Sequence, residues 1–244
     1  MVIHFKSIAL SILATLAMQP ANASDVYEIQ YKGFKIWLDC DSKSAIQWKY
    51  QARRDMGNHE RYQTFYKDPK LPSKCQQTSV SSYKNPKGKV QYDRGHLVPA
   101  NAMDSNQLTI KQSNIMTNVL PQVAVMNRGA MLETELWVEC RRDKEPITVI
   151  GGVYQGNMPH DGDFMISHGI TAPEAFWKVA YANNTVIAWW IPNSTDAVAK
   201  NIDNYIVTPR EIEKRINREI DVPIFLKKNR APRTNAMTKG CQRS

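Results

Sequence analysis

The sequence predicts a single α+β domain with a mixed or antiparallel central sheet and flanking helices. Strand-like patterns occur in both halves of the chain, two stretches have helical spacing, and nothing between residues 27 and 225 has the composition of a linker. The chain has 244 residues, of which 42% are hydrophobic, enough for one sizeable core. We therefore place one domain at residues 24–225, between a signal peptide (1–23) and a basic tail (226–244).

The N-terminus predicts an export signal. Lys6 supplies positive charge, residues 7–18 are apolar or small, and Ala21-Asn22-Ala23 has the small-x-small pattern of a cleavage site. The apolar run is short for a bilayer span, which favours cleavage after Ala23 over a retained membrane anchor. We expect export to the periplasm or the external medium.

Alternating apolar residues predict a β-hairpin within residues 27–50. A polar turn over residues 39–44 precedes renewed alternation as far as Tyr50. The alternating positions are Tyr27, Ile29, Tyr31, Phe34, Ile36 and Leu38.

Residues 51–90 predict a long irregular segment, which is uncommon unless it is functional or crosslinked. An exported chain with an even number of cysteines is expected to form disulfides. Its four cysteines allow three pairings, and the sequence does not choose among them; our working pairing is Cys40–Cys75 with Cys140–Cys241. A structural zinc site is disfavoured, because no two cysteines have C-x-x-C spacing.

The rest of the chain predicts alternating helices and strands. Thr208 as N-cap, Pro209 in the first turn and Glu211 at the reciprocal position predict a helix that continues to about Ile220. Further helices are expected within residues 105–118 and over 122–142. Strands are expected over residues 90–98, 147–153, 176–182 and 185–191, the last two joined by Asn183-Asn184.

The charge balance favours a polyanionic partner. The formal net charge is +9, and Lys6 is the only charged residue before Ser24, so removal of the signal leaves +8. A basic protein suits nucleic acid or an anionic membrane surface. Residues 226–244 hold six basic residues and no acid, which is typical of a solvated tail or of a DNA-tracking arm held by Cys241.

The run Tyr92-Asp93-Arg94-Gly95-His96 has residues suited to phosphodiester hydrolysis. Neutral His96 can take a proton from water, because histidine titrates near neutral pH. Arg94, two positions away, lies on the same face of an extended strand and can bind phosphate oxygens. Gly95 allows substrate or another backbone to approach closely. Read alone, the run is weak support, because an isolated histidine is more often structural.

Residues further along the chain make the sequence pattern more specific than the Asp-Arg-Gly-His run alone. They are Asn118, Pro121-Gln122, Asn127-Arg128-Gly129, Glu135 and the stretch 206–213. Together with the Asp-Arg-Gly-His run they resemble the DNA/RNA non-specific endonuclease family, the ββα-metal nucleases that include Serratia-type nucleases and endonuclease G. The resemblance covers most of the mature chain. Each piece is common by itself, but the joint pattern is specific.

This resemblance implies a one-metal site in a ββα motif. His96 is expected to be the general base, and Asn127 the direct protein ligand of one Mg²⁺, for which Mn²⁺ can substitute. Glu135 lies eight residues after Asn127 on the same helical face and is expected to hold metal-bound water. Glu133 is the alternative to Glu135, and Asn127 could instead be a helix N-cap.

The resemblance also implies residues that grip the phosphate. Arg94 is expected to contact it, and Asn118 to position the loop or the histidine, or else to serve as a turn residue. Arg61 is the candidate for a further phosphate contact, with Arg53 and Arg54 as alternatives. Asp93 is expected to orient backbone or Arg94 rather than to bind metal. No role is assigned to His59, His160 and His168.

The chain departs from the family pattern in two places. Met131 stands where the family commonly has Trp, four positions after the metal asparagine, which concerns helix packing rather than chemistry. The Lys- and Ser-rich residues 73–91 follow no family pattern, so details of the substrate groove do not carry over.

The function predicted is an exported, metal-dependent endonuclease that cuts DNA and RNA, with no membrane partner. Recognition of the phosphate backbone alone is independent of base sequence. The alternative is an exported, non-catalytic DNA-binding protein, against which the joint presence of Arg94, His96, Asn127 and Glu135 argues. A Ser-His-Asp hydrolase is disfavoured, because the chain has no Gly-x-Ser-x-Gly turn.

Overall fold

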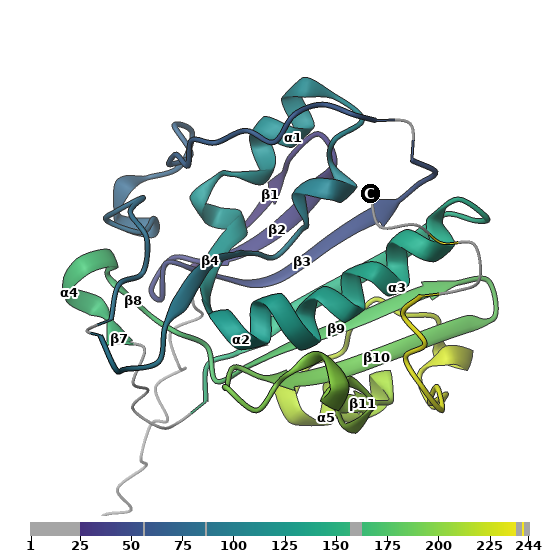
Figure 1. The fold of residues 1–244 in the computed structure, drawn as a ribbon. Helices are drawn as coiled ribbons and strands as arrows, with labels where there is room; N and C mark the ends of the chain where they lie inside the picture. The colour runs from purple at the N-terminus through teal and green to yellow at the C-terminus, as the bar shows by residue number, and fades with distance from the viewer. Residues whose placement is uncertain (1–24, 56, 86, 157–162, 238–240, 242–244) are drawn as a thin grey trace, which may run out of the picture.

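A seven-stranded antiparallel sheet lies at the centre of the computed structural model, which describes residues 25–55, 57–85, 87–156, 163–237 and 241 (Figure 1). The predicted α+β class is confirmed, and every strand pair in the sheet is antiparallel. In spatial order the strands are β1 (Val26–Gln30), β2 (Phe34–Asp39), β3 (Ser44–Ala52), β6 (Ile147–Tyr154), β9 (Ala175–Ala182), β10 (Thr185–Pro192) and β11 (Ile206–Val207).

Strand alternation is confirmed where the sequence predicted it. Phe34, Ile36 and Leu38 of β2 are at most 2% exposed, and the residues between them are only partly buried. The predicted hairpin is two strands of a three-stranded meander, β1–β2–β3. The turn between β9 and β10 uses Asn183 at a φ of 44°, a left-handed conformation that asparagine tolerates better than most residues.

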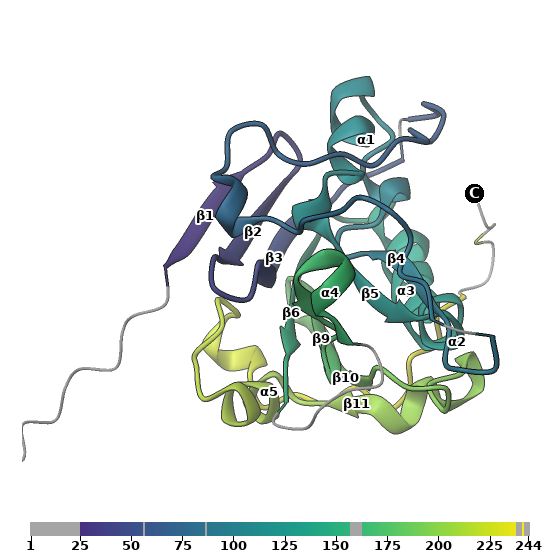
Figure 2. The ribbon, with the colours of Figure 1, turned by 90° about the vertical axis from the view of Figure 1, so that its left-hand side faces the viewer.

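The two faces of the sheet bury separate apolar clusters. Successive side chains of a strand point to opposite faces, so Val149 belongs to the larger cluster and its neighbour Ile150 to the smaller one. The larger cluster packs under α3 (Leu132–Arg142), and the smaller one under α5 (Pro209–Ile216). Figure 2 shows these two helices on opposite sides of the sheet.

The Asp-Arg-Gly-His run lies in a separate two-stranded pair. β4 (Tyr92–His96) pairs antiparallel with β5 (Val119–Val123), with Arg94 opposite Pro121. The chain then enters a helix made of α2 (Ala124–Met126), a π-helical turn η4 (Asn127–Met131) and α3. This is the expected ββα arrangement. The prediction that the helix begins at Gln122 is wrong, because residues 122 and 123 are still paired with β4.

Smaller elements connect these parts. Helix α1 (Gln107–Ser113) follows the N-cap Asn106, and the short turn η3 (Met116–Asn118) leads into β5. Helix α5 has the predicted capping box but ends at Ile216 rather than near Ile220, because Asn217 adopts the left-handed conformation. The remaining elements are β7 (Asp163–Phe164), α4 (Met165–His168), β8 (Ile170–Thr171), and the 3-10 turns η1 (Ser73–Cys75), η2 (Ala100–Ala102), η5 (Ala199–Tyr205) and η6 (Ile224–Leu226).

Two disulfides crosslink the chain, and their pairing is the one assumed from the sequence. Cys40–Cys75 ties the irregular segment to the end of β2, and Cys140–Cys241 ties the C-terminal stretch to α3. The described part of the C-terminal stretch is largely exposed but has several buried anchor residues. Leu226, Lys227, Thr234 and Ala236 are buried.

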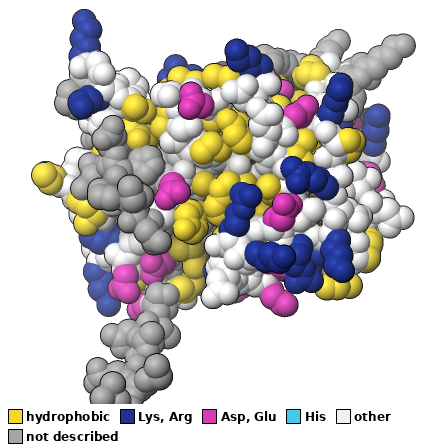
Figure 3. Space-filling view, turned by 90° about the horizontal axis from the view of Figure 1, so that it is seen from below, with side chains coloured by type: hydrophobic (Ala, Val, Ile, Leu, Met, Phe, Trp, Pro, Cys, Tyr) yellow, Lys and Arg dark blue, Asp and Glu magenta, His cyan; other side chains and the backbone are white. Residues whose placement is uncertain are grey.

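Basic side chains are distributed among acidic and apolar ones on the surface that faces downward in Figure 1. Figure 3 shows Lys and Arg intermixed there with Asp, Glu and hydrophobic side chains. That face is therefore not uniformly basic, and net charge alone does not mark a binding surface on it. Within the described ranges, no helix is both long and apolar enough to cross a membrane. The predicted signal peptide and its cleavage site lie outside the described residues.

Candidate active site

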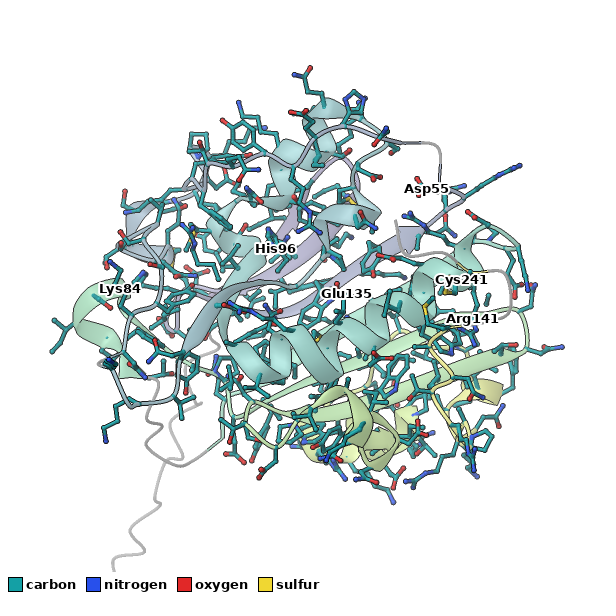
Figure 4. The ribbon with its side chains drawn as sticks, viewed as in Figure 1. Asp55, Lys84, His96, Glu135, Arg141 and Cys241 are labelled. Carbon is teal, nitrogen blue, oxygen red and sulfur yellow. A yellow bond between two sulfur atoms is a disulfide. The ribbon has the colours of Figure 1, made fainter. Side chains whose placement is uncertain are left out.

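A cavity of about 210 Å³ lies where β4, the turn η2 and the helix η4–α3 meet. Figure 4 shows His96 and Glu135, which come from β4 and α3, close to the centre of the molecule. Four of the residues singled out from the sequence line this one cavity, although 74 positions separate the first from the last. The lining residues are Arg61, His96, Pro99, Ala100, Asn127, Arg128, Leu132 and Glu135.

A buried asparagine holds the ring of His96. The Oδ1 atom of Asn114 lies 2.8 Å from Nε2 of His96, and Nδ2 of Asn114 donates to the backbone carbonyl of Tyr62. A carbonyl oxygen can only accept, so this second bond fixes which end of the amide faces the ring. Oδ1 must then accept from Nε2, which therefore carries the ring proton. The other ring nitrogen, Nδ1, keeps the lone pair that a general base uses.

The surroundings of His96 favour its neutral form. Burial lowers the pKa of His96, and the nearby charges of Arg61 and Arg94 act in the same direction, whereas the Asn114 hydrogen bond opposes them. The Phe65 ring lies 5.6 Å from the imidazole, centroid to centroid, and the Arg94 guanidinium lies 3.9 Å from the centre of the same Phe65 ring. Arg94 also donates to the Val80 carbonyl at 2.9 Å. The same-face prediction for Arg94 and His96 is consistent with this shared contact.

Asp93 orients Asn127. Its Oδ2 atom accepts from Nδ2 of Asn127 at 2.9 Å and from Nε of Arg128 at 2.9 Å, and its Oδ1 accepts from Nη2 of Arg128 at 2.6 Å. Because the amide nitrogen of Asn127 faces Asp93, the amide oxygen lies on the other side of the planar group. The expectation that Asp93 orients backbone or Arg94 is not met, since its side-chain partners are Asn127 and Arg128.

Asn127 begins the π-helical turn inside a continuous helix, so it is not an N-cap. The backbone of Gly129 lies close to residues 197–199: a Cβ atom there would come 3.0 Å from the nitrogen of Ala199. Ala130 donates its backbone N–H to the Ala197 carbonyl at 3.1 Å. A π turn adds a residue to one helical turn and so changes the direction of the side chains before it. Here it links Asn127 to the ordinary α-helix that carries Glu135.

Glu135 is in an environment that disfavours its charge. Burial raises the pKa of Glu135 to about 7; Lys178 and Arg61 oppose this rise, and Glu139 adds to it. Lys178 is only 1% exposed and donates to the Thr134 hydroxyl at 2.8 Å. The positive charge of the buried Lys178 ammonium lowers the cost of ionising the partly buried Glu135 carboxyl. Lys178 is a member of this environment that sequence analysis missed, because it lies in the otherwise apolar strand β9.

The structure does not bring Asn118 to the cavity. Its side chain is fully buried, accepts from the Val98 N–H at 2.9 Å, and donates to the carbonyls of Val98 and Ser113. It therefore positions the loop after β4, which is one of the two roles expected, and its side-chain hydrogen bonds go to Val98 and Ser113 rather than to His96. The histidine's partner is Asn114, which sequence analysis missed. No local pattern distinguishes two asparagines four residues apart.

The alternative residues lie outside the cavity lining. Glu133 is absent from it, and Arg53 and Arg54 line a different cavity of about 370 Å³. His168 is bonded to Ser167 and to a backbone carbonyl, so it is structural. His160 lies outside the described residues. The geometry thus groups Arg61, rather than its alternatives, with His96.

The donor set at this cavity fits a hydrated hard cation. In the part of the chain that the structure describes, no three or more His, Cys, Asp or Glu side chains form a group that could hold a metal ion. Asn127 could supply an amide oxygen, and Glu135 could bind an ion through water. Magnesium prefers oxygen ligands and keeps several waters. The cavity volume of about 210 Å³ is many times the ~10–15 Å³ that a single water needs on the same measure.

Comparison with known proteins identifies a family whose activity fits the residues that line this cavity. Residues 14–223 match a family described as DNA/RNA non-specific endonuclease, which is most of the chain. A protein named "Nuclease" from Nostoc sp. (strain PCC 7120 / SAG 25.82 / UTEX 2576) is 28% identical over 175 residues. The matched region is 64% of this chain and 60% of that protein, so the chain spans less than two thirds of its relative's length.

Proposed function

This chain belongs to the DNA/RNA non-specific endonuclease family, and on that premise we propose that it is an exported, Mg²⁺-dependent enzyme that hydrolyses phosphodiester bonds in DNA and RNA with His96 as general base. One observation carries the proposal. The Asn114 amide, locked by the Tyr62 carbonyl, holds Nε2 of His96, and this leaves Nδ1 as a proton acceptor in a ring that lines the same cavity as Asn127 and Glu135.

His96 begins the reaction in its neutral form, which its lowered pKa favours. Nδ1 takes a proton from a water molecule as the oxygen of that water attacks phosphorus; the bond from phosphorus to the 3′ oxygen breaks, and that oxygen leaves with the electron pair and takes up a proton from solvent. The ring then carries a positive charge, which the Asn114 carbonyl oxygen stabilises through the hydrogen bond to Nε2. Asn114 also prevents rotation of the ring, so the water and the accepting nitrogen keep their alignment.

Arginines and the helix supply the remaining functions. Arg61 lines the cavity and Arg94 lies beside His96, so both guanidinium groups can bind non-bridging phosphate oxygens. Asn127 would hold Mg²⁺ through its amide oxygen, and Glu135 would accept hydrogen bonds from the ion's water molecules. When bound, the metal supplies positive charge that stabilises the leaving 3′ oxygen.

Export is the cellular context that we propose. The predicted signal over residues 1–23 motivates it, and two disulfides support it, because disulfides form and persist in oxidising compartments. Binding through phosphates is expected to be independent of base sequence and to weaken as salt concentration rises.

The test is a nuclease assay on plasmid DNA and on RNA with Mg²⁺, with EDTA as a negative control. His96→Ala is expected to lose nearly all cleavage while its thermal unfolding and its DNA affinity stay close to those of the wild type. Glu135→Gln and Glu133→Gln form a matched pair on one helix, of which only Glu135 lines the cavity. Glu135→Gln should lower kcat/KM by at least tenfold, and Glu133→Gln should leave it within twofold.

Two outcomes would contradict the proposal. Wild-type protein that leaves both substrates intact with Mg²⁺ and with Mn²⁺, yet binds DNA, would support the alternative of a non-catalytic DNA-binding protein. Full cleavage by His96→Ala would remove His96 from the reaction.

A further inference from the structure

A second, larger groove opens next to the proposed active site. It has a volume of about 920 Å³ and lies between residues 58–64 and the first turns of α1. Arg61 lines both this groove and the cavity of His96, so the two spaces adjoin at that side chain. The volume is within the range of sites that hold small organic ligands.

An aromatic ring lies in the groove with cations around it. Tyr62 is 37% exposed, and Nζ of Lys111 lies 5.6 Å from the centre of its ring. The ring of Tyr66 meets the Tyr62 ring edge to face, with centroids 6.3 Å apart. Arg61 also lines the groove, and Glu60 is its one acidic lining residue. An exposed ring bordered by cations is the arrangement with which proteins bind unpaired nucleotides, the ring stacking on a base and the cations meeting phosphates.

The backbone of Tyr62 is held in a defined place relative to His96. Nδ2 of Asn114 donates to the carbonyl of Tyr62, and Oδ1 of the same amide accepts from Nε2 of His96. Asn114 is 3% exposed and comes from the end of α1, so this link is buried. A ligand seated on Tyr62 is therefore positioned with respect to the proposed base by one rigid amide group.

We propose that this groove is a subsite for an unpaired nucleotide, with Tyr62 as the stacking platform for its base and with Arg61 and Lys111 on the flanking phosphates. The inference rests on the proposed function, since it takes a nucleic acid as the substrate. The inference adds a preference for unpaired nucleotides over continuous duplex. Bases inside a duplex are already stacked on both faces, whereas an unpaired base has a face to offer to Tyr62. Single strands, loops and frayed ends are thus bound more tightly than continuous duplex.

The experiment measures binding without cleavage. Fluorescence anisotropy in EDTA, at one fixed low salt concentration, compares three labelled ligands: a short single-stranded DNA, the same strand with abasic residues throughout, and the corresponding duplex. Wild-type protein is expected to bind the normal single strand more tightly than the abasic strand. Tyr62→Ala should weaken binding of the normal strand by about 5- to 100-fold and that of the abasic strand by less than twofold.

Two further variants separate stacking from other effects. Tyr62→Phe keeps the ring and should bind the normal strand within about twofold of the wild type. Phe225→Ala removes another exposed aromatic ring, 61% exposed in η6 and outside the groove lining, and should change neither affinity. Circular dichroism and thermal unfolding show whether each variant is folded.

The results that overturn the subsite are specific. Equal wild-type affinity for the normal and abasic strands would do so without any variant, as would an equal loss of affinity for both strands in Tyr62→Ala. Failure of the proposed function has a different signature: base-dependent binding persists in EDTA, but no strand is cut when Mg²⁺ or Mn²⁺ is added.

Discussion

Replacing Asp93 with asparagine tests how the site orients its proposed metal ligand. Asp93 accepts three hydrogen bonds, one from Asn127 and two from Arg128. The Arg128 side chain is 73% exposed, so its ion pair with Asp93 contributes only ~0.2–1 kcal/mol. The bond from Asn127 to the carboxylate contributes about 1.5–3 kcal/mol. Because an amide oxygen remains to accept one bond, we expect Asp93→Asn to cost about 1–2 kcal/mol of unfolding free energy.

The larger effect is expected on metal activation. A carboxylate can only accept, so it holds the Asn127 amide with its nitrogen toward β4. An amide at position 93 can donate as well, and it then permits Asn127 to turn its oxygen away from the cavity. Losing a group that orients a metal ligand typically costs 10- to 100-fold in affinity or activity. We expect the Mg²⁺ concentration for half-maximal kcat/KM to rise by a similar factor.

The assay is a Mg²⁺ titration of DNA cleavage by wild type, Asp93→Asn and Arg128→Met, together with urea unfolding of each. Arg128→Met removes the ion pair but leaves the bond between Asp93 and Asn127, so its Mg²⁺ midpoint should stay near that of the wild type even if kcat/KM falls. An unchanged midpoint in Asp93→Asn, with a stability loss of the expected size, would refute the orienting role.

Four further predictions concern pH and stability. Burial raises the pKa of Glu135 to about 7, so its carboxyl takes up a proton as pH falls below 7. Activation by Mg²⁺ should therefore weaken, by at most tenfold per pH unit, and Glu135→Gln should lose this pH dependence. The same raised pKa means that ionisation destabilises the folded state as pH rises, so Glu135→Gln should unfold at a higher temperature than wild type at pH 8 and lose this advantage near pH 4. Gly95→Ala should cost about 1–3 kcal/mol in urea unfolding, because a Cβ atom there would lie 2.2 Å from the buried Gln122 side chain; a variant as stable as wild type would contradict the close packing. Cys140→Ser should lower the free energy of unfolding by ~4–5 kcal/mol on a chain-entropy estimate, because the Cys140–Cys241 bond closes a loop of 101 residues. An unchanged Tm would argue against this crosslink in solution.

Several elements were predictable because their signals are local. Alternation of apolar residues in β2 reports which side chains face the core, and the structure buries those same residues. The capping box at Thr208 and Glu211 needs only four consecutive residues, and it forms as predicted. The end of that helix was less predictable, because Asn217 can also continue a helix when its surroundings favour it.

Other features depend on residues far apart in the chain. Gln122 has no local signal for a strand, and it is extended because β4 supplies its hydrogen-bond partners. Asn114 and Asn118 are equivalent by type and spacing, yet one reaches His96 and the other closes the loop at Val98. These assignments are decided by where the chain between α1 and β5 lies relative to β4 in three dimensions.

The fold class, the family and the side chains that gather at one cavity, Arg61, His96, Asn127 and Glu135, follow from the order of residues in the chain. How those side chains are held follows from their neighbours in the folded molecule. The tautomer of His96 depends on which atom of Asn114 faces Tyr62, and the orientation of Asn127 depends on a carboxylate 34 positions away. The physical reason is that hydrogen-bond direction and burial are properties of three-dimensional neighbours, whereas side-chain type and periodicity are properties of the chain.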